Sequence, residues 1–390
     1  MGDKVEKKRL LVTASTFPRW EGDTEPRFVM DLCQALTEYF DVTVLVPAAP
    51  GAQDVEMMGD VKVIRYHYFP IHKWETLCYP GAIVPRIKEK KIRILLVPFL
   101  IFALYINLLK YLPEVDVVHA HWLIPQGIIQ SLFKKPYIVT GHGGDVTSLN
   151  FSILKKLKAR CLKNAKCVTV VSQFLKDEVL AIENVEDVRI MPMGCNTENF
   201  SPDYKIENYF NQQEKKVVLF VGRLAEKKGV KYLIEAMKDI DGLLAIVGKG
   251  PLENELKEQA KELGEKVIFL GPKTHSELKQ IYASADIFAA PSVTAKDGDK
   301  EGFGLVILEA MASGLPVVAY DSGGISELIQ SELNGILVEE ANVELLRDNI
   351  KRLLDNPAEW GKYSVAAMET AEKYDYKNIA KGYSEILGDL

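Results

Sequence analysis

Short apolar runs rich in valine, isoleucine and leucine recur along the chain and alternate with segments of helical periodicity, such as residues 28–40. The runs of the first half, each predicted to be a strand, are residues 9–14, 42–46, 61–66, 115–120, 137–140, 167–172 and 188–191. Those of the second half are residues 217–222, 243–248, 267–271, 286–291, 316–320 and 335–338. Because these runs are apolar throughout, we expect parallel strands covered by helices on both faces. The pattern predicts an α/β protein with two doubly wound, Rossmann-like parallel sheets.

The two halves are separated by a polar stretch, residues 203–216, which is predicted to be the linker between two domains. The first domain is then expected over residues 1–202 and the second over residues 217–371. Parallel sheets bind their ligands at the carboxyl ends of the strands, so we expect the site in a cleft between two facing domains. The last segment, residues 358–390, has a helical pattern.

The string E-G-F-G-L-V-I-L-E, residues 301–309, places two carboxylates around the predicted start of a helix near Gly304. Glu301 then lies in the loop before the helix, and Glu309 lies about one and a half turns inside it. A helix N-terminus carries about half a positive charge and several unpaired N–H groups, so it attracts phosphate. Carboxylates beside a phosphate site bind sugar hydroxyls more favourably than they bind the anion. The string therefore indicates a nucleotide-sugar site.

The segment just before this helix offers further groups to a diphosphate. Because glycine allows close approach, backbone N–H groups are expected to come from Gly302, Phe303, Gly304 and Leu305. The alternative for this segment is a simple turn into a helix. For Glu309 the alternative is a partly buried helix carboxylate paired with a lysine.

Arg223 and Lys228 follow directly from a predicted strand and precede a helical pattern. At a strand end, arginine can hold a diphosphate with its bidentate fork and lysine can hold it as a point charge. A leaving diphosphate gains negative charge, so these contacts would strengthen in the transition state. The alternative is that both are solvated surface cations, as is expected for Lys227.

His142 lies in a glycine-rich loop, T-G-H-G-G-D, directly after a predicted strand, where it can reach a substrate. Asp145 follows in the same loop and either binds the acceptor or orients His142. His119 and His121 lie on one face if their strand continues through both residues. A metal site there lacks a third ligand, so both are expected to be structural or to face the acceptor. The alternative for His142 is a structural imidazole held by its loop.

Residues 291–324 resemble the retaining glycosyltransferases of family 4, which have the GT-B fold, and Glu301 and Glu309 match the family's E-x7-E donor motif. Further segments match in the family's order: residues 15–23, 140–146, 193–202 and 221–229. The resemblance implies that Arg223 and Lys228 bind the donor diphosphate. It also implies that Glu309 binds the ribose and Glu301 the donor sugar.

The resemblance also assigns roles in the first domain. It places His142 near the donor sugar and its anomeric carbon. Gly22 lies where the family has a glycine-rich loop that closes over the donor phosphates, although the family often has two adjacent glycines there and this chain has one. Arg27 either reaches an anionic acceptor or is a surface arginine at a helix start. The family's last helix returns to the first domain, which here would involve residues 372–390.

The implied activity is transfer of a hexose or N-acetylhexosamine from a nucleoside diphosphate sugar to a hydroxyl of a glycan or lipid-linked glycan, with retention and without a metal or cofactor. The residues expected to act in catalysis are Glu301, His142, Arg223 and Lys228. A UDP-sugar is favoured over GDP-mannose, because some guanine-using relatives have an aspartate in the loop where this chain has residues 271–275. No protein nucleophile is evident, so front-face substitution is expected rather than the covalent route of retaining glycosidases.

Other functions are compatible with parts of the pattern. A nucleotide-sugar hydrolase, epimerase or phosphorylase would use the same phosphate site with a different pocket in the first domain. A dinucleotide-dependent oxidoreductase is disfavoured, because residues 248–252 lack the third glycine of G-x-G-x-x-G and the two glutamates would be unexplained. A non-catalytic nucleotide-sugar-binding protein would carry the same residues.

Composition limits the partners and the cellular setting. The 390 residues have a formal net charge of −6. Residues 1–200 contain 25 lysines and arginines against 22 acidic residues, whereas residues 201–390 contain 23 against 32. This balance favours an anionic acceptor or surface near the first half and argues against nucleic acid. The five cysteines form no C-x-x-C pair and the N-terminus lacks a signal-peptide core, so we expect a cytoplasmic protein without zinc or disulfides.

Residues 94–109 form a charge-free run of 16 residues that follows a basic segment, residues 86–93. As a helix the run would span about 24 Å, less than the roughly 30 Å hydrocarbon core of a bilayer. Pro98 is also expected to interrupt it, so a transmembrane helix is disfavoured. The pattern predicts either a helix that docks on the inner face of the cell membrane through residues 86–110, which favours a lipid-linked acceptor, or a helix that covers the first sheet.

Overall fold

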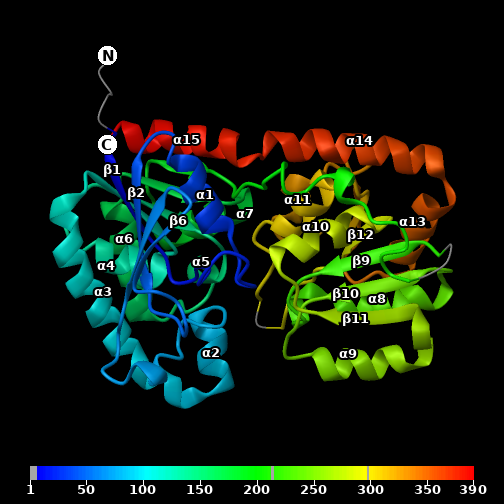
Figure 1. Ribbon diagram of the computed structural model, residues 1–390, viewed down its shortest axis with the longest axis horizontal. Coiled ribbons are helices and arrows are strands. Elements are labelled where there is room, and N and C mark those ends of the chain that lie inside the picture. The colour runs from blue at the N-terminus through cyan, green and yellow to red at the C-terminus, as the bar shows by residue number, and fades with distance from the viewer. Residues whose placement is uncertain (1–6, 212–214, 297) are drawn as a thin grey trace. The chain divides into compact units, whose positions relative to one another are not determined.

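The computed structural model describes residues 7–211, 215–296 and 298–390. The contacts within the chain divide it into two compact units (Figure 1). The first unit comprises Met1–Pro192 together with Tyr376–Leu390, and the second comprises Met193–Asp375. Each unit is built around its own sheet.

The first unit contains an eight-stranded sheet in the order β3-β4-β2-β1-β5-β6-β7-β8. Its strands are β1 (Arg9–Thr13), β2 (Asp41–Pro47), β3 (Val55–Met58), β4 (Val61–Tyr66), β5 (Val117–His121), β6 (Tyr137–Gly141), β7 (Cys167–Val170) and β8 (Val188–Ile190). Neighbouring strands are parallel except β3 and β4, and the strands predicted in this half are confirmed. The apolar pattern does not predict β3, because it is an edge strand whose Val55 and Met57 are exposed.

Helices surround this sheet (Figure 1). They are α1 (Phe28–Leu36), α2 (Ile83–Glu89), α3 (Val97–Tyr111), α4 (Ile128–Gln130), α5 (Gly144–Thr147), α6 (Ser152–Asn164), α7 (Gln173–Ile182) and α15 (Tyr376–Gly388). The C-terminal helix α15 packs against α1, far from it in sequence. Its buried Tyr383 donates a hydrogen bond of 3.2 Å to the carbonyl of Met191. This contact ties the end of the chain to the first unit.

The second unit contains a six-stranded parallel sheet in the order β11-β10-β9-β12-β13-β14. Its strands are β9 (Val217–Val221), β10 (Leu243–Val247), β11 (Val267–Gly271), β12 (Ile287–Ala290), β13 (Val317–Tyr320) and β14 (Ile336–Val338). Its helices are α8 (Val230–Ala236), α9 (Glu253–Ala260), α10 (His275–Ala283), α11 (Leu305–Ala312), α12 (Ile325–Leu328), α13 (Val343–Asp355) and α14 (Pro357–Lys373). All six strands predicted in this half are present, so both halves are α/β units built on predominantly parallel sheets.

Residues 193–202 lie in the second unit, whereas the sequence pattern placed them in the first domain. The reason is a set of hydrogen bonds to the end of α14. The backbone N–H of Cys195 donates to the carbonyl of Tyr374 at 2.9 Å, and the hydroxyl of Thr197 donates to Asp375 at 2.6 Å. The first sheet has already ended at β8, and this segment adds no strand to it.

The predicted linker, residues 203–216, also belongs to the second unit. The backbone N–H of Ile206 donates to the Ser284 hydroxyl at 3.0 Å, and Lys216 forms an ion pair of 3.0 Å with Asp286. Residues 212–214 lie outside the described part of the chain. A polar composition therefore marks a segment on the surface of one unit rather than a connection between two.

The apolar run in the first unit is longer as a helix than the sequence predicts. A 3-10 turn, η2 (Lys91–Leu96), leads directly into α3, and Pro98 stands in the first turn of α3, where a missing N–H is tolerated. The expected interruption at Pro98 is therefore wrong. The helical segment Lys91–Glu114 has 24 residues and is long and apolar enough to cross a membrane by length and composition, with 22% of its most apolar window buried. The length of this segment therefore does not exclude a membrane span.

Candidate functional site

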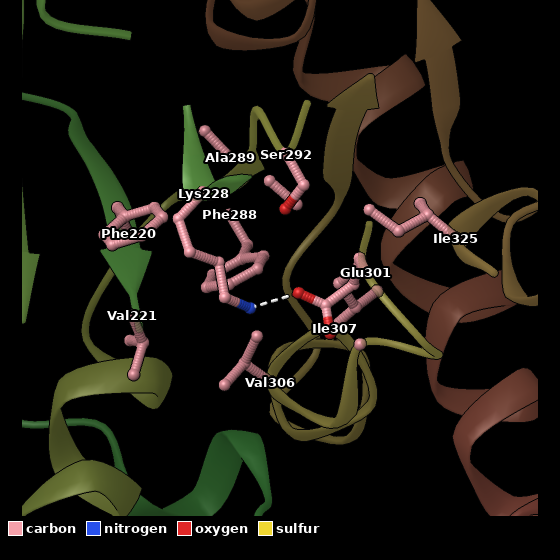
Figure 2. A pocket seen from close by; sticks show the side chains of 12 residues that line it. Phe220, Val221, Lys228, Phe288, Ala289, Ser292, Glu301, Val306, Ile307 and Ile325 are labelled. Carbon is pink, nitrogen blue, oxygen red and sulfur yellow. Dashed lines mark hydrogen bonds and ion pairs between the residues drawn. The ribbon is translucent and has the colours of Figure 1, made fainter. Parts of the chain in front are cut away.

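The second unit brings Lys228 and Glu301 together at the carboxyl ends of its central strands. Lys228 ends the 3-10 turn η6 (Glu226–Lys228) after β9, and Glu301 lies in the loop before α11. The ammonium group of Lys228 donates a short hydrogen bond to Glu301 Oε2 in a pocket bordered by Phe220 and Phe288 (Figure 2). Each of the two charged side chains is 15% exposed. The residues that the sequence assigned to diphosphate and donor sugar are thus neighbours.

Electrostatics keep Glu301 ionised. Burial by itself raises the pKa of Glu301, but the ammonium groups of Lys228 and Lys227 and the backbone N–H of Gly302 outweigh it. The pKa of Glu301 therefore lies below the ordinary value of 4.5. At neutral pH the site holds a carboxylate beside an ammonium group, which can bind a hydroxyl and a phosphate side by side.

Glycines shape the loops around this ion pair. Gly229 follows Lys228 with φ +62°, and a Cβ there would lie 1.8 Å from the carbonyl oxygen of Pro291. Gly323, with φ +61°, would place a Cβ 2.2 Å from the carbonyl oxygen of Glu301. No side chain fits at either position. These two glycines let the loops pack closely enough for the ion pair to form.

The start of α11 lies where the sequence predicted it. Gly304 has φ +95° and precedes the first helical residue, Leu305. The preceding residues Gly302 and Phe303 are buried, and the ring of Phe303 packs against Tyr374 with centroids 5.7 Å apart. Gly304 lines the same pocket as Lys228 and Glu301. The backbone N–H of Gly302, predicted to bind phosphate, is directed at the Glu301 carboxylate.

Glu309 lies in the second turn of α11, and its partners come from α10. Glu309 Oε2 accepts a hydrogen bond of 2.9 Å from the hydroxyl of Tyr282, and its Oε1 is 4.0 Å from His275 Nε2. The Glu309 side chain is 17% exposed. The bond from Tyr282 fixes one carboxylate oxygen and thereby sets the direction of the group. Tyr282 is not among the predicted site residues, because no local motif marks it within its helix.

Arg223 is exposed on the loop after β9, and it forms no ion pair with any described residue. Neighbouring loops approach very closely. A Cβ at Gly248 would lie 2.0 Å from the carbonyl oxygen of Gly222, and one at Gly250 would lie 2.3 Å from that of Leu224. The loops after β9 and β10 therefore pack backbone to backbone and leave the guanidinium group available to a ligand.

The first unit gathers histidines at the ends of β5 and β6. His142 Nε2 lies 2.9 Å from His121 Nδ1, and the rings of His119 and His121 have centroids 4.1 Å apart. Burial lowers the pKa of His142 to about 3, and burial together with His142 lowers that of His119 to about 3. Burial also places the pKa of His121 well below its ordinary value. All three imidazoles are neutral at pH 7, and the predicted shared face of His119 and His121 is confirmed.

Asp145 holds the loop that carries His142. Its Oδ1 accepts hydrogen bonds from the backbone N–H of His142 at 3.0 Å and of Gly143 at 2.9 Å. Its Oδ2 accepts one of 2.9 Å from the N–H of Leu123. Burial raises the pKa of Asp145, although these amides and Lys158 act in the opposite direction. The bonds favour the second of the two predicted roles, in which Asp145 orients His142.

Lys158 is a buried cation that the sequence analysis missed. Its ammonium group donates to the carbonyls of Val146 and Ser148 at 2.9 and 2.6 Å and to the side chain of Asn150 at 2.9 Å. Burial lowers the pKa of Lys158 to about 8, while Asp145 raises it. Within α6 it looks like one of several surface lysines. Only the fold shows that its ammonium group holds the segment that follows the His142 loop.

Gly22 and Arg27 lie in the loop between β1 and α1. Gly22 has φ +82°, with nothing within 4 Å of a Cβ built there. Arg27 stands at the start of α1 and forms ion pairs with Glu21 at 2.8 Å and Asp31 at 3.2 Å. These pairs favour the predicted alternative for Arg27, a helix-start arginine, over direct contact with an anionic acceptor.

Comparison with known proteins identifies the family. The family model for Glycosyltransferase Family 4 matches residues 26–199, and the model for Glycosyl transferases group 1 matches residues 203–374. An uncharacterized glycosyltransferase of Methanocaldococcus jannaschii is 34% identical over 294 residues, covering 68% of this chain and 73% of that protein. The chain belongs to glycosyltransferase family 4. The resemblance seen in the sequence is confirmed, and the protein is a glycosyltransferase enzyme.

A further relative and a structural neighbour of this glycosyltransferase carry different nucleotide sugars in their names. A GDP-mannose-dependent alpha-(1-6)-phosphatidylinositol monomannoside mannosyltransferase of Mycolicibacterium smegmatis is 30% identical over 264 residues, covering 64% of this chain and 69% of that protein. The crystal structure of Anabaena HepE in complex with UDP-glucose has a TM-score of 0.71 and 21% identity, covering 98% of this chain and 100% of that one. The structural likeness supports the GT-B fold of two parallel-sheet α/β domains, as predicted.

Proposed function

We propose that this glycosyltransferase moves a hexose or N-acetylhexosamine from a nucleoside diphosphate sugar to a sugar hydroxyl with retention of the anomeric configuration. The observation that carries the proposal is the Lys228–Glu301 pair beside the start of α11. A cation and a helix N-terminus in one pocket suit the diphosphate of a donor, and the carboxylate beside them suits its sugar hydroxyls.

In the proposed reaction the bond between the anomeric carbon and the diphosphate oxygen breaks while the acceptor oxygen bonds to the same face of that carbon. The leaving phosphate accepts the proton of the acceptor hydroxyl. Lys228 and Arg223 stabilise the charge that develops on the diphosphate, which makes their contacts stronger in the transition state than in the ground state. Glu301 accepts hydrogen bonds from donor hydroxyls, and Glu309 does so from the ribose. No protein nucleophile and no metal are required.

His142 is proposed to orient the donor sugar as a neutral hydrogen-bond donor. His121 Nε2 is buried without a hydrogen-bond partner among the described residues. An unpaired acceptor there is more tolerable than an unpaired N–H, so His121 Nδ1 is the better candidate to donate to His142 Nε2. In that tautomer His142 carries its own proton on Nδ1, which is then free to donate to a hydroxyl.

The base of the donor is proposed to lie against the loops after β10 and β11, and we favour uridine. Loop residues 271–275 carry no carboxylate. The nearest one, Glu277, is already engaged by the capping box of α10, where it accepts a bond of 2.8 Å from the N–H of Thr274, and by Lys273 at 3.1 Å. A guanine, which presents N–H donors, would find no unpaired carboxylate there. Anabaena HepE supports this choice, whereas the mycobacterial relative supports GDP-mannose.

A lipid-linked glycan acceptor is proposed because α3 exposes an apolar face. Leu100, Leu104 and Leu108 are buried, one turn apart. The opposite face leaves large side chains in solvent; the exposed residues are Phe99, Ile101, Phe102, Ile106 and Leu109. Single exposed apolar residues are common, but a continuous face of this kind marks an interaction site. We place the enzyme in the cytoplasm with this face on the inner surface of the cell membrane.

The basic segment before α3 contributes less charge than its sequence suggests. Arg86 and Arg93 both form ion pairs with Glu89, at 2.5 and 3.0 Å. Exposed lysines remain at positions 90 and 91. Sedimentation with vesicles that contain anionic lipid tests the docking: Phe102→Glu should reduce binding, while Leu180→Glu, at an exposed leucine of α7, should not. Equal binding by both variants would refute docking through α3.

Thermal stability measured with UDP, GDP, UDP-glucose and GDP-mannose tests the donor site. A ligand at about one hundred times its dissociation constant should add roughly 2.7 kcal/mol to the free energy of unfolding. We expect a shift with the uridine ligands that is lost in Glu309→Ala and kept in Glu258→Ala, a matched change at an exposed glutamate of α9. A shift with guanosine ligands alone would overturn the choice of base. No shift with any of the four would overturn the proposed site.

A further inference from the structure

A cluster of metal-ligating side chains lies in the first unit, on the loop that follows β4. It consists of His67, His72 and Glu75, whose potential ligand atoms all lie within 4.8 Å of one another. His67 comes directly after β4, His72 opens the 3-10 turn η1 (His72–Trp74), and Glu75 follows that turn. We propose that these three residues bind a divalent transition-metal ion of the zinc class, which pins the loop at residues 67–75.

Glu75 is oriented as a metal ligand would be. Its carboxylate is buried, with the residue 3% exposed. Its Oε1 accepts hydrogen bonds from the backbone N–H groups of Tyr68 and Phe69, the latter at 2.9 Å. This leaves Oε2 directed at His67, whose Nδ1 lies 2.6 Å away. Ligating carboxylates in proteins are held by such second contacts, which fix the geometry of the site before the ion arrives.

The two imidazoles complete the donor set. The rings of His67 and His72 are stacked with centroids 3.5 Å apart and an angle of 7° between their planes. Because an imidazole nitrogen binds a metal in the plane of its ring, the exposed ring of His72 has to turn out of this stack to share an ion with His67. The other ring nitrogen of His67 lies 3.1 Å from Asp54 Oδ1, which is the carboxylate–histidine contact typical of metal-bound histidine. Two imidazole nitrogens and one carboxylate oxygen suit zinc, cobalt or nickel and leave a position for water.

A hydrogen-bonded loop without a metal is the competing explanation. It accounts for His67, which bridges Asp54 and Glu75, but it leaves the ring nitrogens of His72 without a hydrogen-bond partner among the described residues. The loop also packs Phe69 against Phe99 of α3, with centroids 4.9 Å apart. A bound ion would therefore hold the loop against α3.

The inference goes beyond the proposed sugar transfer and does not depend on it, since none of these residues belongs to the donor site. The test uses the full-length protein, first stripped with a chelator and then titrated with Co²⁺. We expect visible d–d absorption that saturates at one Co²⁺ ion per protein chain, without the thiolate charge-transfer band that a cysteine ligand would give. Zn²⁺ should displace Co²⁺ and remove this absorption. Absence of the band, or a thiolate band, would overturn the proposal.

His72→Ala is the principal variant, because His72 is exposed and its loss should not affect folding, whereas Glu75 is buried. Loss of this ligand should weaken Co²⁺ binding at least about 100-fold. His275→Ala, at a partly exposed histidine of the second unit, is the matched control and should leave the titration unchanged. Equal affinity in wild type and His72→Ala would overturn the site.

Limited proteolysis gives a readout that is independent of spectroscopy. Lys73 is exposed within the loop and is a target for trypsin. Zn²⁺ should slow cleavage after Lys73 in the wild-type protein and should have no effect in His72→Ala. Cleavage that Zn²⁺ does not slow in the wild type would contradict a role of the ion in holding the loop.

Discussion

The two units place opposite kinds of polar group at the carboxyl ends of their strands. The second unit holds full charges, since Lys228 pairs with Glu301 and Arg223 is exposed. The first unit holds neutral groups, because burial keeps His142 and His121 uncharged at pH 7. Charges suit a diphosphate that gains negative charge as it leaves, and neutral donors suit hydroxyls whose charge does not change. The difference matches the proposed roles, in which cations of the second unit hold the diphosphate and a neutral histidine of the first unit donates to a sugar hydroxyl.

Removing the charge from the second unit should have the largest effect. We expect Lys228→Ala to lower kcat about 10²- to 10³-fold, because a preorganised contact to the developing charge is lost. The measurement is release of nucleoside diphosphate from the donor that binds best. Lys227→Ala is the matched control, since Lys227 is adjacent and pairs instead with Asp299 at 3.0 Å. Equal losses in both variants would mean that Lys228 has no special role.

Glycine substitutions compare how tightly the loops of the two units are packed. Gly229→Ala in the second unit should destabilise the protein by more than about 3 kcal/mol, because its Cβ would meet the carbonyl of Pro291 at 1.8 Å in addition to the strain of φ +62°. Gly22→Ala in the first unit meets nothing within 4 Å, so only the strain of φ +82° applies, about 1–2 kcal/mol. Thermal unfolding measures both. Similar melting temperatures for the two variants would contradict the close approach at Gly229.

His121 tests whether the neutral histidines act together. His121→Asn should lower kcat about 10-fold with little change in the donor KM, because His142 loses the partner that sets its tautomer and direction. Since the pKa of His142 is about 3, kcat of the wild type should show no histidine ionisation between about pH 5.5 and 8. A histidine ionisation in the pH profile of kcat within that range would contradict the low pKa of His142. An unchanged kcat in the variant would show that His121 does not position His142.

Much of the fold follows from the sequence because continuous apolar runs specify strands covered on both faces. The errors occur where a distant contact overrides local composition. Residues 193–202 are held by the end of α14, and Pro98 falls in a helical turn that tolerates it. Glu309 could be identified from its motif, but Tyr282, 27 positions away, becomes its partner only through the packing of α10. Motifs indicate candidate groups for binding a ligand, whereas the residues that orient those groups depend on the fold.

Acid should weaken the two units in different pH ranges. An unfolded histidine binds a proton near pH 6.5, whereas folded His119, held by a 2.7 Å contact to the Thr140 hydroxyl, stays neutral to about pH 3. Between these values the unfolded chain binds more protons, so the free energy of unfolding falls as pH falls, by up to about 1.4 kcal/mol per pH unit for each such histidine. Glu301, with its lowered pKa, retains its contribution until the pH drops below 4.5.

The difference between wild type and His119→Gln isolates this histidine, since groups common to both proteins cancel. These include Asp145, whose raised pKa makes it act in the opposite direction. Chemical unfolding at pH 7, 6 and 5 should show the wild type losing more stability than the variant with each step below pH 6.5. Parallel losses would mean that His119 titrates normally in the folded protein. The neutral histidine cluster would then no longer distinguish the first unit from the charged site of the second.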